Sequence, residues 1–470
     1  MMQKQESKRA MLLTQAPVRL MVSLSLPAIV GMVVVGLYTF VDAIYVGQLV
    51  GATAMGAVAV AYPFTFVNSG LSSLIGMGSA SVLSRAIGAN DQRTIDRVAG
   101  NLVFMNIVLS SAVTVLGIVF ARELLMLAGA EGEMLELATS YLRIIFAGSL
   151  FVNFGQSSNM IMRGEGELVK AMLIMASSAV LNIVLAPAFI LALRGQGLGV
   201  EGAACATVLS QAALAALMAW WFAKREKVAR VHGVRFDGAL FSEVLKVGFS
   251  AFFMQVLTLV QQAVIYRAAA EWGGAEWQIL FGAALRVQAF AFIPLWGVSQ
   301  GFQPAAGTNY GAGRYARVRR IAVTFALGAT ALALVFWIPA LLAPEALLSL
   351  FITDPAIVAL GAGDFRVFFS TYVLLGFMII AITLLQALGK GGKAAVLTLV
   401  RPLIAFLPLV VVVPRLAGLG IHGVWLASAL SDGCVAVIAV VLMLGEFSRM
   451  RALERDGACS SDALEGEGAR

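Results

Sequence analysis

The sequence predicts an all-α polytopic membrane protein with twelve transmembrane helices in two repeated six-helix lobes. The composition, the apolar runs and an internal repeat support this prediction. Of the 470 residues, 60% are hydrophobic and only 13% are charged, whereas soluble domains carry about 25% charged residues. The mean hydropathy of +0.90 is too high for a chain that folds around one soluble core.

Twelve apolar runs are each long enough for a membrane helix, which needs about 20 residues. The predicted spans are 20–46, 53–82, 97–120, 139–161, 168–193, 200–223, 244–269, 277–303, 319–342, 364–388, 394–415 and 421–446. They define an N-terminal tail, an N-terminal lobe, a polar linker, a C-terminal lobe and a C-terminal tail. In that order, these parts are residues 1–19, 20–223, 224–243, 244–446 and 447–470.

The basic residues predict the orientation of the chain. Most of the 33 Lys and Arg residues lie in the tails and in the loops after even-numbered spans. Because basic loops stay in the cytoplasm, we expect a multi-pass protein of the plasma (inner) membrane with both termini cytoplasmic. The net charge of +7 is then a topology signal, and we expect no nucleic-acid partner. The three cysteines and two histidines suggest neither a disulfide nor a metal centre.

An internal repeat relates the two predicted lobes. "YLRIIF" (141–146) in the first lobe matches "DFRVFF" (364–369) in the second. "GLGVEGAACA" (197–206) matches "GLGIHGVWLA" (418–427) at a similar offset. Halves repeated in parallel orientation are typical of transporters whose site lies between them. The alternative is a duplicated scaffold with no transport role. The G-x-G-x-x-G spacing in these loops does not predict nucleotide binding, because no strand precedes it.

A single carboxylate, Asp42, stands in the first apolar run, with Tyr38 one helical turn before it. A charged residue at the membrane centre costs roughly 2.5–3.5 kcal/mol on insertion scales and normally faces a polar interior. Burial disfavours the charged form, so we expect Asp42 to bind and release a proton, as a coupling carboxylate requires. The alternative is an acid held protonated by a neighbouring hydroxyl, or one that stays hydrated near the outer interface.

Other polar residues recur in the spans. In the first half they are Asn68, Asn153, Gln156, Asn159, Asn182 and Thr207. Their oxygens can hydrogen-bond an acid or ligate a small cation, although each alone is more typical of bonding between helices. Asp432 in the last span is either a second titrating group or a packed, hydrogen-bonded one. Arg286 and Arg401 are expected to pair with carbonyls or a lipid phosphate.

Several motifs resemble those of the MATE (multidrug and toxic compound extrusion) family, and look closest to its prokaryotic DNA-damage-inducible, DinF-like branch. The resemblance covers roughly residues 20 to 445. The motifs are "LPAIVG" (26–31), "VDAIYVGQLVG" (41–51), "RAIGAND" (85–91), "MRGEG" (162–166), "LNIVLAPAFI" (181–190), "GVEGAACATVLSQ" (199–211) and "NYGAG" (309–313).

The resemblance implies two lobes around a central cavity and cation-driven antiport of organic cations or other amphipathic compounds. It also implies a pocket in the N-terminal lobe that takes the proton or sodium. The matching residues are Asp42, Tyr38, Tyr141, Asn159, Asn182 and Thr207. One departure concerns the fifth span, where many relatives carry a second acid four residues after the asparagine. This chain has Ala186 there, which favours a proton over sodium.

We therefore expect a proton-coupled multidrug antiporter that is not an enzyme. Its partners are a small cationic or amphipathic substrate and membrane lipids, and we expect a monomer. No cofactor is expected beyond the coupling ion, H⁺ or alternatively Na⁺. The competing hypothesis is a flippase for lipids or lipid-linked oligosaccharides on a related fold. A flippase should have a strongly cationic cavity, whereas Arg286 and Arg401 are the only basic residues predicted deep within the spans.

Overall fold

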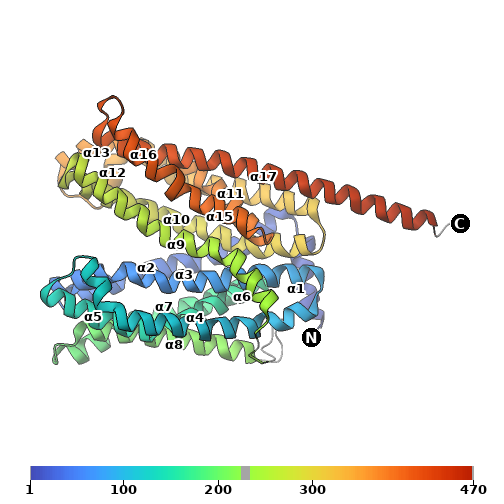
Figure 1. Ribbon diagram of the computed structural model, residues 1–470, viewed down its shortest axis with the longest axis horizontal. Helices are drawn as coiled ribbons and strands as arrows, with labels where there is room; N and C mark the ends of the chain where they lie inside the picture. The colour runs from blue at the N-terminus through green and yellow to red at the C-terminus, as the bar shows by residue number, and fades with distance from the viewer. Residues whose placement is uncertain (1, 224–232, 235, 468–470) are drawn as a thin grey trace. The chain divides into compact units, whose positions relative to one another are not determined.

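The computed structural model describes residues 2–223, 233–234 and 236–467 (Figure 1). Part of the predicted linker 224–243 therefore lies outside the described residues. The described chain contains helices and no strand, which confirms the all-α prediction. It divides into two units. The first unit contains residues 26–83 and 91–259, and the second contains residues 2–25, 84–90 and the chain from residue 260 onward.

The helices of the first unit are α2 (Pro17–Leu49), α3 (Ala52–Ala89), α4 (Gln92–Leu127), α5 (Gly132–Ala147), α6 (Ser149–Gly164), α7 (Leu168–Arg194), α8 (Gly199–Ala223) and α9 (Gly238–Gly273). Three helices of the first unit, α2, α3 and α9, also contribute residues to the second. Within the first unit, α7 and α8 pack along each other, and α6 packs against both.

The second unit contains an additional N-terminal helix and the C-terminal helices. They are α1 (Met2–Thr14), α10 (Ala275–Gly311), α11 (Tyr315–Leu342), α12 (Pro344–Leu348), α13 (Pro355–Ser370), α14 (Tyr372–Ala387), α15 (Gly391–Leu399), the π-helix η1 (Val400–Phe406), α16 (Leu407–Val412), the 3₁₀-helix η2 (Val413–Gly418) and α17 (Gly420–Glu467). The predicted C-terminal tail begins inside α17, which continues well past the other helices of its unit (Figure 1).

The membrane-spanning helices match the predicted number. Eleven helices of the described chain are long and apolar enough to cross a bilayer, and a bent pair, α5 with α6, supplies a twelfth span. Three predicted spans are interrupted within the membrane. The interrupted spans are 139–161, 364–388 and 394–415. In the last of these, Pro402 lies within a π-helical turn, because proline cannot donate a backbone hydrogen bond.

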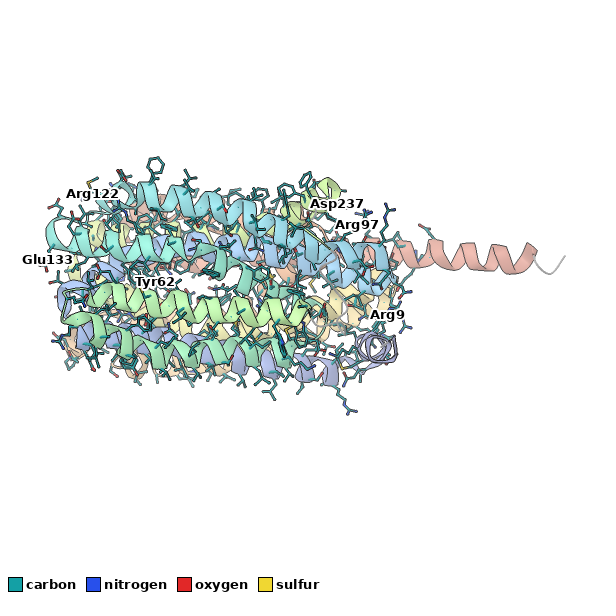
Figure 2. All side chains as sticks on the ribbon, turned by 90° about the horizontal axis from the view of Figure 1, so that it is seen from below. Arg9, Tyr62, Arg97, Arg122, Glu133 and Asp237 are labelled. Atoms are coloured by element: carbon teal, nitrogen blue, oxygen red, sulfur yellow. The ribbon has the colours of Figure 1, made fainter. Side chains whose placement is uncertain are left out.

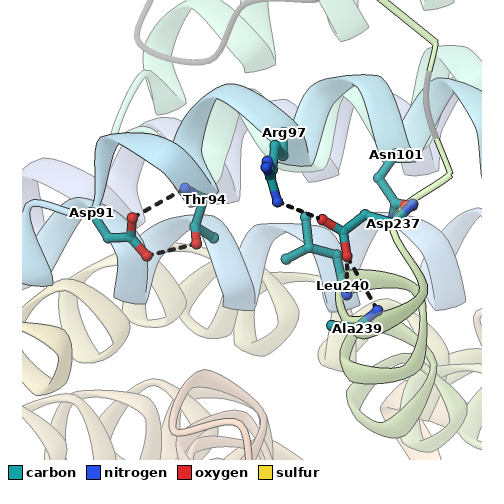
Figure 3. Close-up of polar contacts among 7 residues, drawn as sticks. All are labelled: Asp91, Thr94, Arg97, Asn101, Asp237, Ala239 and Leu240. Atoms are coloured by element: carbon teal, nitrogen blue, oxygen red, sulfur yellow. Dashed lines mark hydrogen bonds and ion pairs between the residues drawn. The ribbon is translucent and has the colours of Figure 1, made fainter.

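Polar groups at the helix ends tie the first unit together. Figure 2 shows Arg122 and Glu133 near one end of its helices and Arg97 and Asp237 toward the other. At the latter end, Asp237 accepts hydrogen bonds from the first amide groups of α9, at Ala239 and Leu240 (Figure 3). The same carboxylate pairs with Nη1 of Arg97 on α4 at 3.2 Å. The end of the predicted linker is therefore anchored to α4.

Asp91 begins α4 as its N-cap. Its side chain accepts hydrogen bonds from the Thr94 amide at 3.1 Å and the Thr94 hydroxyl at 2.6 Å (Figure 3). These bonds hold the pKa of Asp91 below its usual range, and the bond from the Thr94 hydroxyl contributes most. A capping carboxylate of this kind satisfies amide groups that the first helical turn leaves without a partner.

The fourth span breaks at Gly148, where α5 and α6 meet at 52°. A Cβ atom on Gly148 would lie only 2.6 Å from Cγ2 of Val208 on α8, so glycine lets α8 pack against the break. The Thr114 hydroxyl of α4 donates to the Phe146 carbonyl at 3.0 Å. Polar backbone groups freed inside a membrane need such partners, and the bond explains how the break is tolerated.

The tenth span carries a matching break, at Thr371 between α13 and α14. Thr371 is the counterpart of Gly148 at the offset that relates "YLRIIF" to "DFRVFF". Trp337 is the counterpart of Thr114 at the same offset, and its Nε1 donates to the Ser370 carbonyl at 2.9 Å. The duplication therefore extends to the way each break is satisfied.

A second repeated contact supports the same offset. Nε of Arg143 donates to the Ile118 carbonyl at 3.4 Å, and Nε of Arg366 donates to the Leu341 carbonyl at 3.0 Å. Both members of the second pair are the repeat counterparts of the first pair. The two halves thus repeat a contact between neighbouring spans, as well as a sequence pattern.

Close packing of α7 and α8 generates a stability prediction at Gly202. A Cβ atom there would lie 2.7 Å from the Phe189 carbonyl oxygen of α7. We expect Gly202→Ala to force the helices apart and to lower the free energy of unfolding by roughly 1–3 kcal/mol, as overpacking does. Thermal unfolding of the purified protein in detergent measures the effect.

Gly195→Ala is the matched control, because Gly195 has φ −62° and nothing within 4 Å of its Cβ position. It should leave the unfolding midpoint unchanged. Equal midpoints for the two variants would contradict the close approach of α8 to α7.

Candidate functional site

Asp42 lies in α2, eight residues before Val50. Its side chain is partly buried, and its Oδ1 atom is buried without a hydrogen-bond partner among the described residues. A buried carboxylate oxygen without a partner is costly unless it binds a proton, a cation or water. Asp42 is therefore the starting point for a site in the first unit.

The depth of Asp42 follows from a contact between α2 and α8. A Cβ atom on Gly199, the first residue of α8, would lie 3.0 Å from Cγ1 of Val50 at the end of α2. Asp42 precedes Val50 by eight residues, and Thr207 follows Gly199 by eight residues. At 1.5 Å per residue, each lies about 12 Å along its helix from this contact. Since both helices span the membrane, Asp42 and Thr207 lie at one depth.

Thr207 is hydrogen-bonded to Asn182 across the interface between α7 and α8. The Asn182 amide donates to Oγ1 of Thr207 at 3.3 Å and to Oγ of Ser210 at 3.4 Å. The Thr207 hydroxyl donates in turn to the Ala203 carbonyl at 3.1 Å. Oδ1 of Asn182 remains buried with no partner among the described residues. Two of the predicted site residues, Asn182 and Thr207, are thus in direct contact, and the amide oxygen of Asn182 remains available as an acceptor.

The break in the fourth span reaches the same depth. Gly148 contacts Val208, which directly follows Thr207. Ser149, the first residue of α6, has a buried Oγ atom with no partner among the described side chains. Interrupted membrane helices commonly supply polar groups to transporter sites. The break therefore adds a helix start and a hydroxyl group to the depth at which Asp42, Asn182 and Thr207 lie.

Tyr141 and Tyr38 complete the predicted aromatic residues. Tyr141 of α5 is buried in a hydrophobic cluster that also contains Val46 of α2 and Ala203 of α8. These two neighbours are each one turn from Asp42 and Thr207, so Tyr141 lies on the outer side of that pair. The side chain of Tyr38 lies outside the described residues, and its role stays a prediction.

Asn159 lies away from the pair that Asn182 and Thr207 form. Its amide donates to the Ala171 carbonyl at 2.7 Å. Ala171 precedes Asn182 by eleven residues on α7, which corresponds to about 16 Å along the helix. Asn159 thus lies toward the cytoplasmic end that the basic loops predict. Its membership of the coupling pocket stays a prediction that this position does not favour.

A second group of hydrogen-bonded polar side chains connects α3, α4 and α6, and it was not predicted as a group from the sequence. The Asn153 amide donates to Ser110 at 3.0 Å, and its carbonyl oxygen accepts from Ser72 at 2.7 Å. Asn106 donates to Ser157 at 3.0 Å. All five side chains are buried.

A sequence signal for this group exists in retrospect. Each of the three helices carries two small polar residues four positions apart, and such residues share one face of a helix. The pairs are Asn68 with Ser72, Asn106 with Ser110, and Asn153 with Ser157. The sequence interpretation weighed Asn68 and Asn153 one at a time, so the pattern was missed.

Asp432 of the second unit is paired. Its Oδ1 atom lies 2.7 Å from Nε of Arg401, in η1. The Ser431 hydroxyl also donates to the Arg401 carbonyl at 3.1 Å. Of the two alternatives for Asp432, the contacts favour the packed, hydrogen-bonded one. They also give Arg401 a protein partner in place of the expected carbonyl or lipid phosphate.

The arrangement in the first unit can bind a proton. At one depth it brings together a carboxylate, an amide oxygen without a partner and two hydroxyl groups. Once protonated, Asp42 becomes a donor, whereas Asn182 offers an acceptor. A small cation would need several oxygen ligands. Among the described residues at this depth, Asp42 alone supplies charged oxygens, and Ala186 is a buried apolar residue.

Comparison with known proteins bears on the identity of the chain. The family model described as MatE matches residues 27–188 and again residues 250–411. The offset between the two matches agrees with the internal repeat. The multidrug export protein MepA of Staphylococcus aureus strain MRSA252 is 25% identical over 425 residues, covering 90% of this chain and 92% of the relative. MepA of Staphylococcus haemolyticus is 26% identical over 436 residues, covering 92% and 94%.

Solved structures give the same result. An outward-facing multidrug resistance MATE family transporter of the MOP superfamily aligns with a TM-score of 0.87 and 27% identity, covering 94% of this chain and 98% of the other. A MOP superfamily transporter from Pyrococcus furiosus, described as having a binding pocket of reverse polarity, also has a TM-score of 0.87 at 27% identity, covering 95% and 98%. The chain is therefore a multi-pass membrane protein that belongs to the MATE family.

Proposed function

We propose that this protein is a proton-coupled antiporter that exports organic cations or other amphipathic compounds by alternating access. The observation that carries the coupling step is the position of Asp42, whose unpartnered carboxylate oxygen lies at the depth of Asn182 and Thr207. A group that binds a proton from one side and releases it to the other needs this partly desolvated position. The MepA relatives are named multidrug export proteins, which supports drugs as the class of compound that is transported.

The repeated halves support alternating access, because a duplicated transporter opens its site to each face by moving one half against the other. We infer that both termini are cytoplasmic, since the basic loops lie on their side of the spans. The family consists of transporters, and we propose no enzymatic activity. We also propose that a monomer is the working unit and that H⁺ is its coupling ion.

The flippase alternative receives less support. It requires a cationic cavity for phosphate groups, and its two candidate cations were Arg286 and Arg401. Arg401 is neutralised by Asp432 at 2.7 Å. The carboxylate and amide groups of the first unit are better suited to a proton and a cationic substrate than to a phosphate.

Asp42→Asn tests the coupling role, since it keeps the shape of the side chain and removes its titration. We expect export of a cationic dye to fall to the background of cells without the transporter, at an unchanged amount of membrane-inserted protein. Dye resistance and quantitative blotting in the same cells measure the two quantities. Undiminished export would refute the coupling role.

Asn182→Ala and Asn159→Ala form a second, matched test. Of the two, Asn182 lies at the depth of Asp42, so its loss should lower proton-coupled uptake up to about tenfold, the upper size expected for one hydrogen bond between neutral groups. Asn159→Ala should leave uptake within about twofold of the wild type, given its separation of about 16 Å. Uptake into proteoliposomes with equal protein content decides the matter. Equal losses for both variants would show that the depth assignment is wrong.

The identity of the coupling ion has its own test. Because Ala186 leaves Asp42 as the only acid of the site, a pH gradient alone should drive transport in sodium-free proteoliposomes. Fluorescence of an internal pH indicator should report substrate-triggered proton movement, with an imposed sodium gradient at constant pH as the control. Uptake that required sodium and ignored the pH gradient would overturn the proton assignment.

A further inference from the structure

Two rows of buried polar side chains face each other on α4 and α6 of the first unit. In each row the residues are four positions apart and therefore share one face of their helix. This polar ladder consists of Ser110 and Asn106 on α4 and of Ser149, Asn153 and Ser157 on α6. The Asn153 amide donates to Ser110 at 3.0 Å. The Asn106 amide donates to Ser157, also at 3.0 Å.

The polar ladder begins at the depth of Asp42 and continues toward the cytoplasm. Ser149 is the first residue of α6, at the break that reaches this depth. Asn153 and Ser157 follow it by four and eight residues, which corresponds to about 6 and 12 Å along the helix. Beyond them, α6 leads into the basic loop after the fourth span, and the charge of that loop predicts the cytoplasmic side.

Buried polar atoms without a hydrogen-bond partner among the described residues occur at each level of the polar ladder. They are Oγ of Ser149, Oδ1 of Asn106 and Nδ2 of Asn68 on α3, whose Oδ1 accepts from Asn153 at 3.4 Å. Unbonded polar atoms in a protein interior are costly, and buried water commonly supplies the missing hydrogen bonds. Since these atoms include donors and acceptors, they can hold a file of water molecules.

The second half of the chain shows that the helices can pack without these polar groups. Asn106 and Ser110 correspond in the repeat to Ala329 and Ala333, and Asn153 and Ser157 correspond to Gly376 and Ile380. The counterpart helices, α11 and α14, nevertheless pack against each other. The counterpart of Asp42 is Ile265. The polar ladder therefore occurs in the half that carries the membrane acid, and both are replaced by apolar residues in the other half.

Asn101 connects the lower end of the polar ladder with the end of the helices. It lies five residues before Asn106 on α4, is buried, and donates to the sulfur of Met105 at 3.6 Å. Its Oδ1 accepts from the Asp237 amide at 3.4 Å. The Asp237 side chain is partly exposed and pairs with Arg97 (Figure 3). Only the thioether of Met105, a flexible side chain, adjoins both asparagines along α4.

We propose that the polar ladder conducts the exchanged proton between Asp42 and the cytoplasm through the water molecules that it binds. When Asp42 releases its proton, the O–H bond of the carboxyl group breaks and a new O–H bond forms on the nearest water, which passes on another proton. The hydroxyl groups of Ser110 and Ser157 can both accept and donate in this relay, whereas the amide groups orient the water. This route rests on the proposed coupling role of Asp42.

Asn106→Leu tests the route, because leucine keeps the approximate size of asparagine and removes its polar atoms. In proteoliposomes, uptake of a cationic dye driven by a pH gradient should fall about tenfold, the upper size expected for one hydrogen bond between neutral groups. Exchange of labelled for unlabelled dye moves no net proton and should keep the wild-type rate. Damage to helix packing would slow both processes, so the two rates distinguish a proton route from a structural role.

A milder variant and a matched control complete the comparison. Ser110→Ala removes one hydroxyl group of the polar ladder and should also lower pH-driven uptake without slowing dye exchange. Thr383→Val removes a buried hydroxyl group that bonds to Ser299 at 2.7 Å between two helices of the second unit. This control loses a comparable contact outside the polar ladder and should leave both rates unchanged. All rates are compared at equal amounts of reconstituted protein.

Asp42→Asn in the same vesicles separates the route from the coupling role. If pH-driven uptake survived this change, the coupling role would be wrong and the route with it. If Asp42→Asn abolished pH-driven uptake while Asn106→Leu and Ser110→Ala kept it in full, the route alone would be wrong. Equal losses of exchange and of pH-driven uptake in the two polar-ladder variants would show that these residues only hold the helices together.

Discussion

A polar group inside a bilayer has to find its partner within the protein, and the break of the fourth span at Gly148 concentrates this requirement at one depth. The break frees backbone groups, one of which is satisfied by Thr114. It brings the start of α6 against Val208, beside Thr207, and the contact of Val50 with Gly199 sets Asp42 level with them. The site is thus a consequence of how an interrupted helix packs.

The two halves share this framework but differ in what fills it. Both breaks are satisfied by a donor from the preceding span, and both halves repeat the arginine-to-carbonyl contact. The polar group around Asn153 has no counterpart in the second half, since Ala291 and Gly376 are the repeat counterparts of Asn68 and Asn153. The second half has a different buried contact, between the hydroxyl groups of Ser299 and Thr383 at 2.7 Å. In the second half, the buried Asp364 is paired with His422 at 2.8 Å. The two halves therefore share the arrangement of their helices but differ in the polar side chains that they bury.

Sequence reasoning recovered what depends on local pattern. Apolar length gave the spans, and the match of Arg143 with Arg366 lay within a recognised repeat. Contacts between helices could not be predicted in this way, because the sequence of one span does not show at which depth it meets another span. Asn159 was grouped with Asn182 through the family resemblance, although about 16 Å separates their levels along α7. The break at Gly148 was missed because glycine is common in apolar runs, and only Val208 packed against it shows its role.

The central claim is that Asp42 carries the exchanged proton. Calorimetry of dye binding to the purified transporter, repeated in buffers of different ionisation enthalpy, measures the protons released per dye bound. Linkage predicts about one proton for the wild type when binding requires the charged form of Asp42, and none for Asp42→Asn at equal dye occupancy. The same proton release from both proteins would contradict the account.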